Sequence, residues 1–448
     1  MTKEKQNDAI YDARQLGTGR MFVLGLQHMF AMFGATVLVP LITGLSVSAT
    51  LLFAGIGTLL FHLLTKRKVP AFLGSSFAFL GGYAAVSTMC AEAGVEHFSA
   101  YAGVGVACAG LLYVVLSILF KVFGANKVMR FFPPIVTGPI IIAIGLILSS
   151  SAIANCNANW WIALVAIVVV IACNIWGKGM IKIIPILLGV VVSYIVAAVT
   201  KNVDFTAVKE AAWIGIPFKF EDTAFSLFKG ADASLIITSI ITIMPIALAT
   251  IIEHIGDVSA ISSTVGKNYI ADPGLHRTLL GDGLATSLAA LFGAPANTTY
   301  GENTGVLALS KVYDPKVVRI AAVLAILFSF SPKFAALINS MPTATVGGVS
   351  LILYGMISAV GVRNVVENQV DFTKSRNVII AALILVLSIG INYSEMGAVA
   401  FTVGGITISL SGLAVAALVG IILNAVLPGK DYEFGKNQQG ETSVNFKV

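Results

Sequence analysis

Apolar stretches of about 20 residues recur along this 448-residue chain from Met21 to Leu427. An α-helix of about 20 residues crosses the hydrocarbon core of a bilayer, which is roughly 30 Å thick. The composition agrees, because 57% of the residues are hydrophobic and 11% are charged, whereas soluble domains carry roughly 25% charged residues. The chain also lacks the roughly ten-residue alternation of a transmembrane β-barrel. The sequence therefore predicts an all-α polytopic membrane protein.

About fourteen spans are predicted. They lie near residues 21–41, 45–65, 69–88, 98–120, 131–151, 158–177, 181–200, 234–257, 278–293, 296–312, 317–339, 342–361, 376–394 and 403–427. Basic residues cluster on alternate sides of these spans, whereas short opposite loops such as "NYSEMG" are acidic or neutral. Because cytoplasmic loops carry the excess of Lys and Arg, the tails 1–20 and 428–448 are both predicted to be cytoplasmic. The protein is predicted to lie in the cell inner (plasma) membrane. The segment 201–233 is predicted to be an external loop with a piece that lies on the membrane surface.

Several classes of protein are disfavoured by what the sequence contains. The basic loops explain the net charge of +6, so no nucleic-acid partner is expected. The polar first 20 residues carry no apolar segment with a cleavage site, so no signal peptide is expected. The four cysteines are scattered without CxxC spacing, and the chain has no GxxxxGK[ST], no HExxH and no metal-spaced His or Cys cluster. We therefore expect neither an enzyme nor a cofactor or metal, and a channel would need a lined pore instead.

Faint internal echoes indicate that the chain consists of two related halves. "LQHM" (Leu26–Met29) opens the first span of one half, and "IEHI" (Ile252–Ile255) closes the first span of the other. "PPIVTG" (Pro133–Gly138) and "PTATVG" (Pro342–Gly347) each begin a fifth span. Because seven is odd, two seven-span halves would have opposite orientations. Inverted repeats of this kind are typical of transporters, whose substrate site lies near the midplane of the membrane.

The third span of each predicted half is too polar and too rich in glycine for a continuous lipid-facing helix. These segments are "PAFLGSSFAFLGG" (Pro70–Gly82) and "GAPANTTYGENTGV". Irregular backbone at membrane depth is tolerated only where protein buries it or where it lines a cavity. We expect a short extended piece that continues into a half-helix, whose free N–H groups point towards the bilayer centre. Close helix packing through small residues is the alternative.

Four acids fall within predicted spans. Acids at membrane depth are costly and usually functional. Glu253 and Glu302 are the deepest of the four, and Asp257 shares a helix face with Glu253 because it lies four residues further on. A helix end near water is an alternative place for Asp257, and a helix-start cap is an alternative role for Asp282. His28, also within a span, is either a hydrogen-bonded structural group or a proton carrier.

At these residues the chain resembles the uracil permeases of the nucleobase–ascorbate transporter family. The resemblance is carried by "QHMFAMFGATVLVPL", "GSSFAF", "EHIGD", "DPGLHR", "NTTYGENTGV" and "GGVSLILYG". It extends from Leu26 to about Leu427, and "ENTGVLALSK" (Glu302–Lys311) fits the family signature with Ser310 where threonine is commoner. One departure is Asp257, which stands where some uracil permeases carry a second histidine.

The resemblance implies two inverted seven-span halves that are divided into a core and a gate domain. The core would comprise residues 21–130 and 234–341, and the gate would comprise residues 131–200 and 342–427. The third and tenth spans would begin as short antiparallel strands. The resemblance also implies that Glu253 and Glu302 contact the base and that the backbone at Phe77 and Gly301 assists them.

Ser76 and Tyr300 complete the predicted substrate site, and His28 would lie near Tyr300. The chemistry fits uracil, because carboxylates accept from its two ring N–H groups, backbone amides donate to its carbonyls, and the Phe77 ring suits its flat face. A purine such as xanthine is the closest alternative, although purine carriers often have glutamine where this chain has Glu302. An anion transporter of the same fold is less compatible with carboxylates that point into the site.

Proton symport is the predicted coupling, with Glu302 as proton carrier and His28 and Asp257 as further coupling residues. Burial disfavours a charged carboxylate, whereas the end of the adjoining half-helix favours one. Sodium coupling is disfavoured because the sequence assembles no set of oxygen ligands outside the base site. The expected partners are a nucleobase, protons and the lipid bilayer. The sequence leaves the oligomeric state open, and a homodimer is one option.

Overall fold

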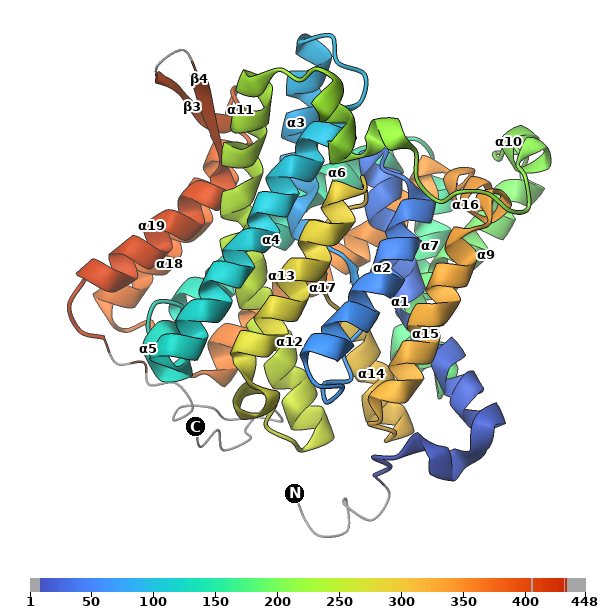
Figure 1. Ribbon diagram of the computed structural model, residues 1–448, viewed down its shortest axis with the longest axis horizontal. Helices are drawn as coiled ribbons and strands as arrows, with labels where there is room; N and C mark the ends of the chain where they lie inside the picture. The colour runs from blue at the N-terminus through green and yellow to red at the C-terminus, as the bar shows by residue number, and fades with distance from the viewer. Residues whose placement is uncertain (1–8, 404–405, 431, 433–448) are drawn as a thin grey trace.

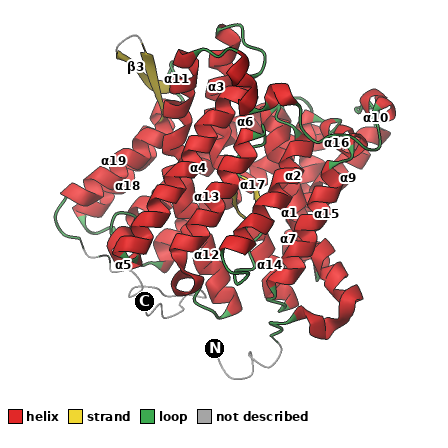
Figure 2. Ribbon diagram, in the orientation of Figure 1, coloured by secondary structure: helices red, strands yellow, loops and turns green. Residues whose placement is uncertain are grey.

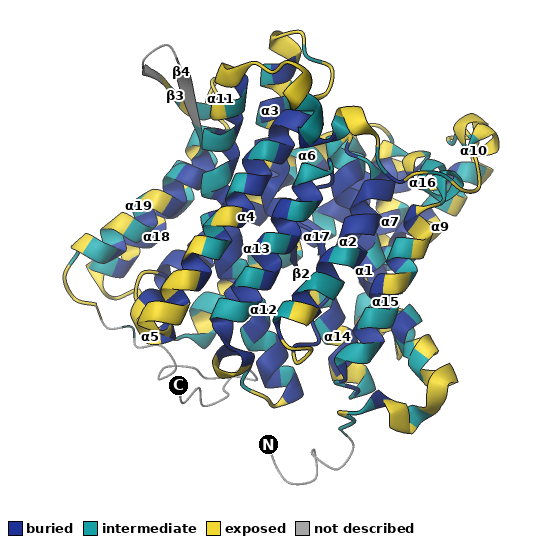
Figure 3. Cartoon of the chain, viewed as in Figure 1, coloured by how far each residue is buried: buried dark blue, intermediate teal, exposed yellow. Residues whose placement is uncertain are grey.

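The computed structural model describes residues 9–403, 406–430 and 432. This part of the chain is predominantly helical, with little strand (Figure 1, Figure 2). Within it, seven helices are long and apolar enough to cross a membrane, or eight if one bent helix pair counts as a span. Large apolar side chains are exposed, such as Val115 on α4 (Phe98–Phe123) and Val386 on α18 (Ser375–Asn392). Figure 3 shows exposed residues along outer helices such as α19 (Gly412–Val426). The protein is therefore a multi-pass membrane protein.

Besides two 3-10 helices, the first half of the chain contains nine α-helices and one strand among the described residues. They are α1 (Gly17–Thr43), α2 (Val47–Leu64), β1 (Leu73–Ser75), α3 (Leu80–Glu92), α4 (Phe98–Phe123), α5 (Ala125–Met129), α6 (Pro134–Cys156), α7 (Trp160–Trp176), α8 (Met180–Ile183) and α9 (Pro185–Val199). The predicted loop 201–233 contains α10 (Thr206–Glu210) and two short 3-10 turns.

The second half has a similar order, but three helices rather than two precede its first strand, and a pair of strands precedes its last helix. Its elements are α11 (Ala233–Ile243), α12 (Ala247–Val265), α13 (Leu275–Leu291), β2 (Asn297–Thr299), α14 (Gly301–Ser310), α15 (Pro315–Ser329), α16 (Pro332–Asn339), α17 (Thr343–Glu367), α18 (Ser375–Asn392), β3 (Ala398–Val403), β4 (Ile406–Ser411) and α19 (Gly412–Val426).

Helices of the two halves pack in matching pairs. Helix α6 packs along α17, α7 packs against α17, and α18 packs against α6. In the same way, α7 pairs with α9 as α18 pairs with α19, and α1 contacts α15 as α11 contacts α4. If each helix of a pair is replaced by its counterpart in the other half, another observed pair results. For example, the pair of α7 with α17 becomes the pair of α18 with α6. Two related halves of seven spans would produce this exchange of partners.

The predicted span at 317–339 is not one continuous helix. The structure has two helices there, α15 and α16, which meet at an angle of 89°. Pro332 is the first residue of α16, and the Ser331 side chain caps that helix by accepting from the N–H of Phe334. Proline cannot continue the hydrogen bonding of the preceding helix, and a capping serine begins a new one. The chain therefore turns at Ser331.

The expected last span, 403–427, is helical only from Gly412. Before it, β3 and β4 pair as antiparallel strands, with Ala398 opposite Ser411 and Val403 opposite Ile406. The two segments, "AVAFTV" and "ITISLS", are rich in β-branched residues, which favour extended backbone over helix. The predicted start of this span is thus corrected by nine residues, and positions 404–405 lie outside the described part of the chain.

Close approach of α4 and α13 depends on glycine. A Cβ added at Gly110 would lie 2.5 Å from the carbonyl oxygen of Gly283 and 2.9 Å from the amide nitrogen of Ser287. Backbone at such distances cannot move aside without shifting a helix. Small residues permit this kind of packing between membrane helices.

We therefore expect Gly110→Ala to destabilise the protein by about 1–3 kcal/mol, the usual effect of overpacking. Gly390→Ala is the matched control, because a Cβ at Gly390 meets nothing within 4 Å. Helix propensity alone would make that control neutral or stabilising by roughly 0.5–1 kcal/mol. Thermal unfolding of both variants in detergent measures the difference, and equal melting temperatures would contradict the close approach.

Candidate functional site

Two three-residue strands meet in the interior of the protein. β1 and β2 are antiparallel, with Leu73 opposite Thr299 and Ser75 opposite Asn297. Each strand runs directly into a helical segment, β1 into a 3-10 turn at Phe77–Phe79 followed by α3, and β2 into α14. Figure 1 shows α3 and α14 on opposite sides of the molecule, at the top and the bottom of the view. The predicted short antiparallel strands with half-helices are confirmed.

Surrounding residues hydrogen-bond to several polar groups of these strands. The Asn297 amide donates to the carbonyl of Phe53 at 3.1 Å, and the Thr286 hydroxyl donates to the carbonyl of Asn297 at 3.0 Å. The hydroxyl of Tyr300 donates to the carbonyl of Ser75 at 2.8 Å. A buried strand edge without such partners would be costly, so these bonds hold the irregular backbone at depth.

A cavity of about 580 Å³ lies beside the strand–helix junctions. Five of the predicted substrate-site residues line it, and so does the predicted coupling residue Asp257; these are Phe77, Glu253, Asp257, Tyr300, Gly301 and Glu302. Glu302 is in the first turn of α14, where the N–H groups at a helix start are free to bind an acceptor. The cavity thus brings the carboxylates of Glu253, Asp257 and Glu302 together with the Phe77 ring and the start of α14, and Arg363 and Glu367 also line it.

Asp257 lies inside α12 rather than at a helix end, and it is part of a polar network. The Thr299 hydroxyl donates to the Asp257 carboxylate at 2.9 Å. The same hydroxyl oxygen is 3.5 Å from Nδ1 of His254, which is 2.8 Å from the Asp282 carboxylate. Strand β2 therefore connects the cavity to a buried His–Asp pair.

Asp282 lies in the interior of α13 and is fully buried. The alternative of a helix-start cap is therefore wrong, because α13 begins seven residues earlier and the carboxylate pairs with His254. Sequence reasoning missed the role of His254. Its place in the "IEHI" echo was a signal, but the pairing depends on how α12 and α13 pack.

His28 is buried in α1 and contacts α14. The Asn303 amide nitrogen is 3.1 Å from Nδ1 of His28 and donates to its backbone carbonyl at 3.0 Å. Asn303 directly follows Glu302, so His28 acts on the start of α14 through a hydrogen bond. The hydrogen bonds of His28 go to Asn303, three residues beyond Tyr300.

Ser76 is buried, and it is not one of the described residues that line the cavity. Its backbone N–H donates to the carbonyl of Ala296 at 2.8 Å and so extends the strand pairing. Conversely, α6 and α17 supply cavity residues that were not predicted, among them Thr137, Met356 and Asn364. Thr137 lies in the "PPIVTG" echo, so the repeat was the signal for its segment.

Comparison with known proteins identifies the family of the chain. A family model described as "Permease family" matches residues 19–397. The chain belongs to this permease family. The permease is 41% identical to the uracil permease of Bacillus caldolyticus over 436 residues, which cover 95% of this chain and 96% of that protein. It is 38% identical over 464 aligned residues to the uracil permease of Bacillus subtilis (strain 168), with full coverage of both chains.

Two solved structures share the fold of the permease. The transmembrane domain of the cyanobacterial bicarbonate transporter BicA matches with a TM-score of 0.64 at 16% identity, over 93% of this chain and 99% of that domain. The murine anion transporter Slc26a9 in its inward-facing state matches with a TM-score of 0.65 at 11% identity, over 91% of this chain and 67% of that one. The permease therefore shares the fold of these two proteins. Its membership of the permease family indicates a transporter.

Proposed function

We propose that this permease imports uracil across the cell inner (plasma) membrane by proton symport. The observation that carries the proposal is the cavity in which Glu253 and Glu302 accompany the free N–H groups at the start of α14. Uracil is neutral and presents N–H donors beside carbonyl acceptors. A site with carboxylate acceptors and backbone donors complements both. The names of the related uracil permeases support the same substrate.

The two glutamates would accept hydrogen bonds from the uracil ring, and the N–H groups near Phe77 and Gly301 would donate to its carbonyls. Phe77 packs edge-on against Tyr354 of α17, with ring centroids 6.0 Å apart. That contact gives the ring a fixed place against which a flat base can stack. A small anion is less compatible with the site, because the carboxylates of Glu253, Asp257 and Glu302 would repel it.

Transport would proceed by movement of a core domain against a gate domain. We assign the spans in 21–130 and 234–341 to the core and those in 131–200 and 342–427 to the gate, which gives fourteen spans in two inverted halves. The lining of the cavity supports this division, since α12 and α14 form one wall and α6 and α17 form another. The lining of the cavity continues along α17 to Asn368. We propose that this end of α17 faces the cytoplasm, which would suit the release of uracil into the cell.

Selectivity among bases tests this proposal. If the site pairs with the ring N–H groups, uracils methylated on nitrogen should compete with labelled uracil at least about tenfold less well, the usual effect of losing a hydrogen bond to a charged group. A substituent at ring carbon 5 leaves these groups intact, so 5-fluorouracil should compete nearly as well as uracil. Uptake of labelled uracil into proteoliposomes, with each compound as competitor, gives the ranking.

Xanthine and uric acid are the controls for the purine alternative. The proposal requires both to compete weakly. Equal competition by xanthine and uracil would make the permease a purine or broad nucleobase carrier. Failure of every nucleobase to compete would contradict a nucleobase site altogether.

A further inference from the structure

The N-terminal segment Ile10–Leu16, here called the N-terminal clasp, joins two distant parts of the chain. The N–H of Ile10 donates to the carbonyl of Lys311 at 2.9 Å, and the N–H of Tyr313 donates to the carbonyl of Ile10 at 2.8 Å. This parallel bridge attaches the clasp to the residues directly after α14, the helix that carries Glu302.

The same segment also holds the end of α12, the helix that carries Glu253. The hydroxyl of Tyr11 donates to the carbonyl of Val265 at 2.8 Å, and Val265 is the last residue of α12. The Lys267 ammonium lies 4.2 Å from the centre of the Tyr11 ring, which also packs on Tyr313 at 5.5 Å. The last carbonyls of a helix lack partners within the helix, so Tyr11 supplies one from outside.

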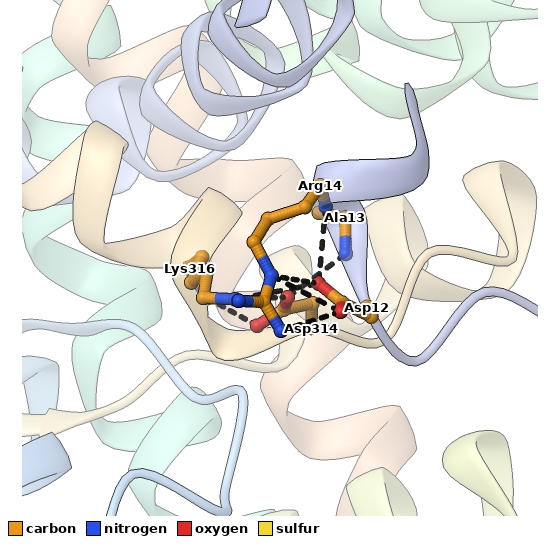
Figure 4. A network of polar contacts seen from close by, with 5 residues as sticks. All are labelled: Asp12, Ala13, Arg14, Asp314 and Lys316. Carbon is orange, nitrogen blue, oxygen red and sulfur yellow. Dashed lines mark hydrogen bonds and ion pairs between the residues drawn. The ribbon is translucent and has the colours of Figure 1, made fainter. Parts of the chain in front are cut away.

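A carboxylate network fixes the clasp to the start of α15 (Figure 4). Asp314, which is 6% exposed, accepts from the N–H of Ala13 at 2.9 Å and caps α15 by accepting from the N–H of Lys316 at 2.9 Å. Asp12 is 2.8 Å from Arg14 and 3.3 Å from the Lys316 ammonium. Asp314 is the buried centre of this network, so its loss should release the clasp.

The geometry of α14 shows why such anchoring matters. The helix has ten residues, and isolated helices shorter than about 12–15 residues are marginal. At its start, Asn303 is bonded to His28. At its end, the clasp holds Lys311. Val265 is about 18 Å along α12 from Glu253 and Lys311 is about 14 Å along α14 from Glu302, at about 1.5 Å per residue. A shift at either anchored end is carried along a rigid helix to the carboxylate.

From these contacts we propose that the N-terminal clasp positions Glu253 and Glu302 relative to each other, with Tyr11 and Asp314 as its positioning residues. The proposal rests on the proposed function of the two glutamates in uracil binding. Binding sites need their groups held to about 0.5 Å. Without the clasp, α12 and α14 can shift independently, and the site loses affinity for uracil although the protein still folds in the membrane.

The first measurement is uracil binding to the purified full-length permease. Tyr11→Phe removes one hydroxyl and should raise the Kd about threefold, whereas Asp314→Ala removes two accepted bonds and should raise it about tenfold. Tyr313→Phe is the matched control for the first variant and should leave the Kd unchanged. Asp371→Ala controls for the second, since Asp371 caps a turn before α18 by accepting from the N–H of Thr373. It should change thermal stability without changing the Kd.

The second measurement is hydrogen exchange without substrate. In Tyr11→Phe, amide exchange should rise in Ser262–Lys267, which Tyr11 contacts directly. It should also rise in Gly301–Leu307, the part of α14 that carries Glu302. This readout does not depend on uracil. If the parent fails to bind uracil, the proposed function fails, and the exchange alone decides the positioning role.

Two results would overturn the inference. One is a parent that binds uracil while Tyr11→Phe and Asp314→Ala bind it equally well, which would leave the clasp a purely structural element. The other is a rise in exchange confined to residues 9–16, which would mean that the clasp does not transmit to α12 or α14.

Discussion

Glu253→Ala and Glu302→Ala should each weaken uracil binding at least about tenfold, because removing the charged partner of a buried hydrogen bond costs roughly 1.5–3 kcal/mol. Both carboxylates line the same cavity. Each loss leaves a ring N–H of the base without its carboxylate acceptor. Uracil titration of purified protein, followed by calorimetry or by the shift in melting temperature, gives the change in affinity.

Glu210→Ala is the matched control, since Glu210 is exposed at the end of α10. It should bind uracil like the parent. Glu253→Gln and Glu302→Gln separate charge from shape, because the amide keeps a weaker carbonyl acceptor. If Glu253→Ala keeps the affinity of the parent, Glu253 does not contact the base.

Uracil should accumulate in proteoliposomes when a pH gradient, acidic outside, is imposed in the absence of sodium. Glu302, Glu253 and Asp257 line one cavity, and like charges at close range disfavour simultaneous ionisation. The Thr299 hydroxyl donates to Asp257, which is the bond that an ionised carboxylate accepts best. Glu302 adjoins the α14 start and borders the cavity, so it is the group that we expect to exchange a proton with each transport cycle.

In Glu302→Gln, exchange of labelled for unlabelled uracil should outlast accumulation driven by the pH gradient. The amide can still bind the base but cannot carry a proton. Glu395→Gln, an exposed position, should accumulate uracil like the parent. Accumulation in the parent that ignores pH and follows a sodium gradient would rule out the proton mechanism.

Hydropathy located the long apolar helices, and polar residues with glycine marked the two strand–helix junctions. Each of these signals is contained in a segment of about 20 residues. "NTTYGENTGV" is an example, because its polar residues and glycines within an apolar chain are enough to predict a cavity-lining strand and half-helix. The deep acids Glu253 and Glu302 could be found in the same way, since a charge at membrane depth is costly wherever it lies.

Helix ends were less predictable. The turn at Ser331 and the strands of 398–411 lie in apolar sequence that satisfies the hydropathy criterion for a span. Capping and β-propensity decide such boundaries at a cost of about 1 kcal/mol. This free energy is small compared with the hydrophobic contribution of a 20-residue window, so hydropathy alone does not reveal where a helix ends.

The sequence by itself determined that this protein is a membrane helix bundle with two polar interruptions and carboxylates at depth. Only the tertiary structure decided which groups meet. His254 pairs with Asp282, His28 meets Asn303, and Tyr11 reaches a carbonyl 254 residues away. The reason is physical. In a soluble helix one apolar face marks the side that packs. In a membrane bundle lipid-facing and protein-facing sides are both apolar, so the choice of neighbours is left to shape complementarity, small-residue contacts and buried hydrogen bonds across the whole chain.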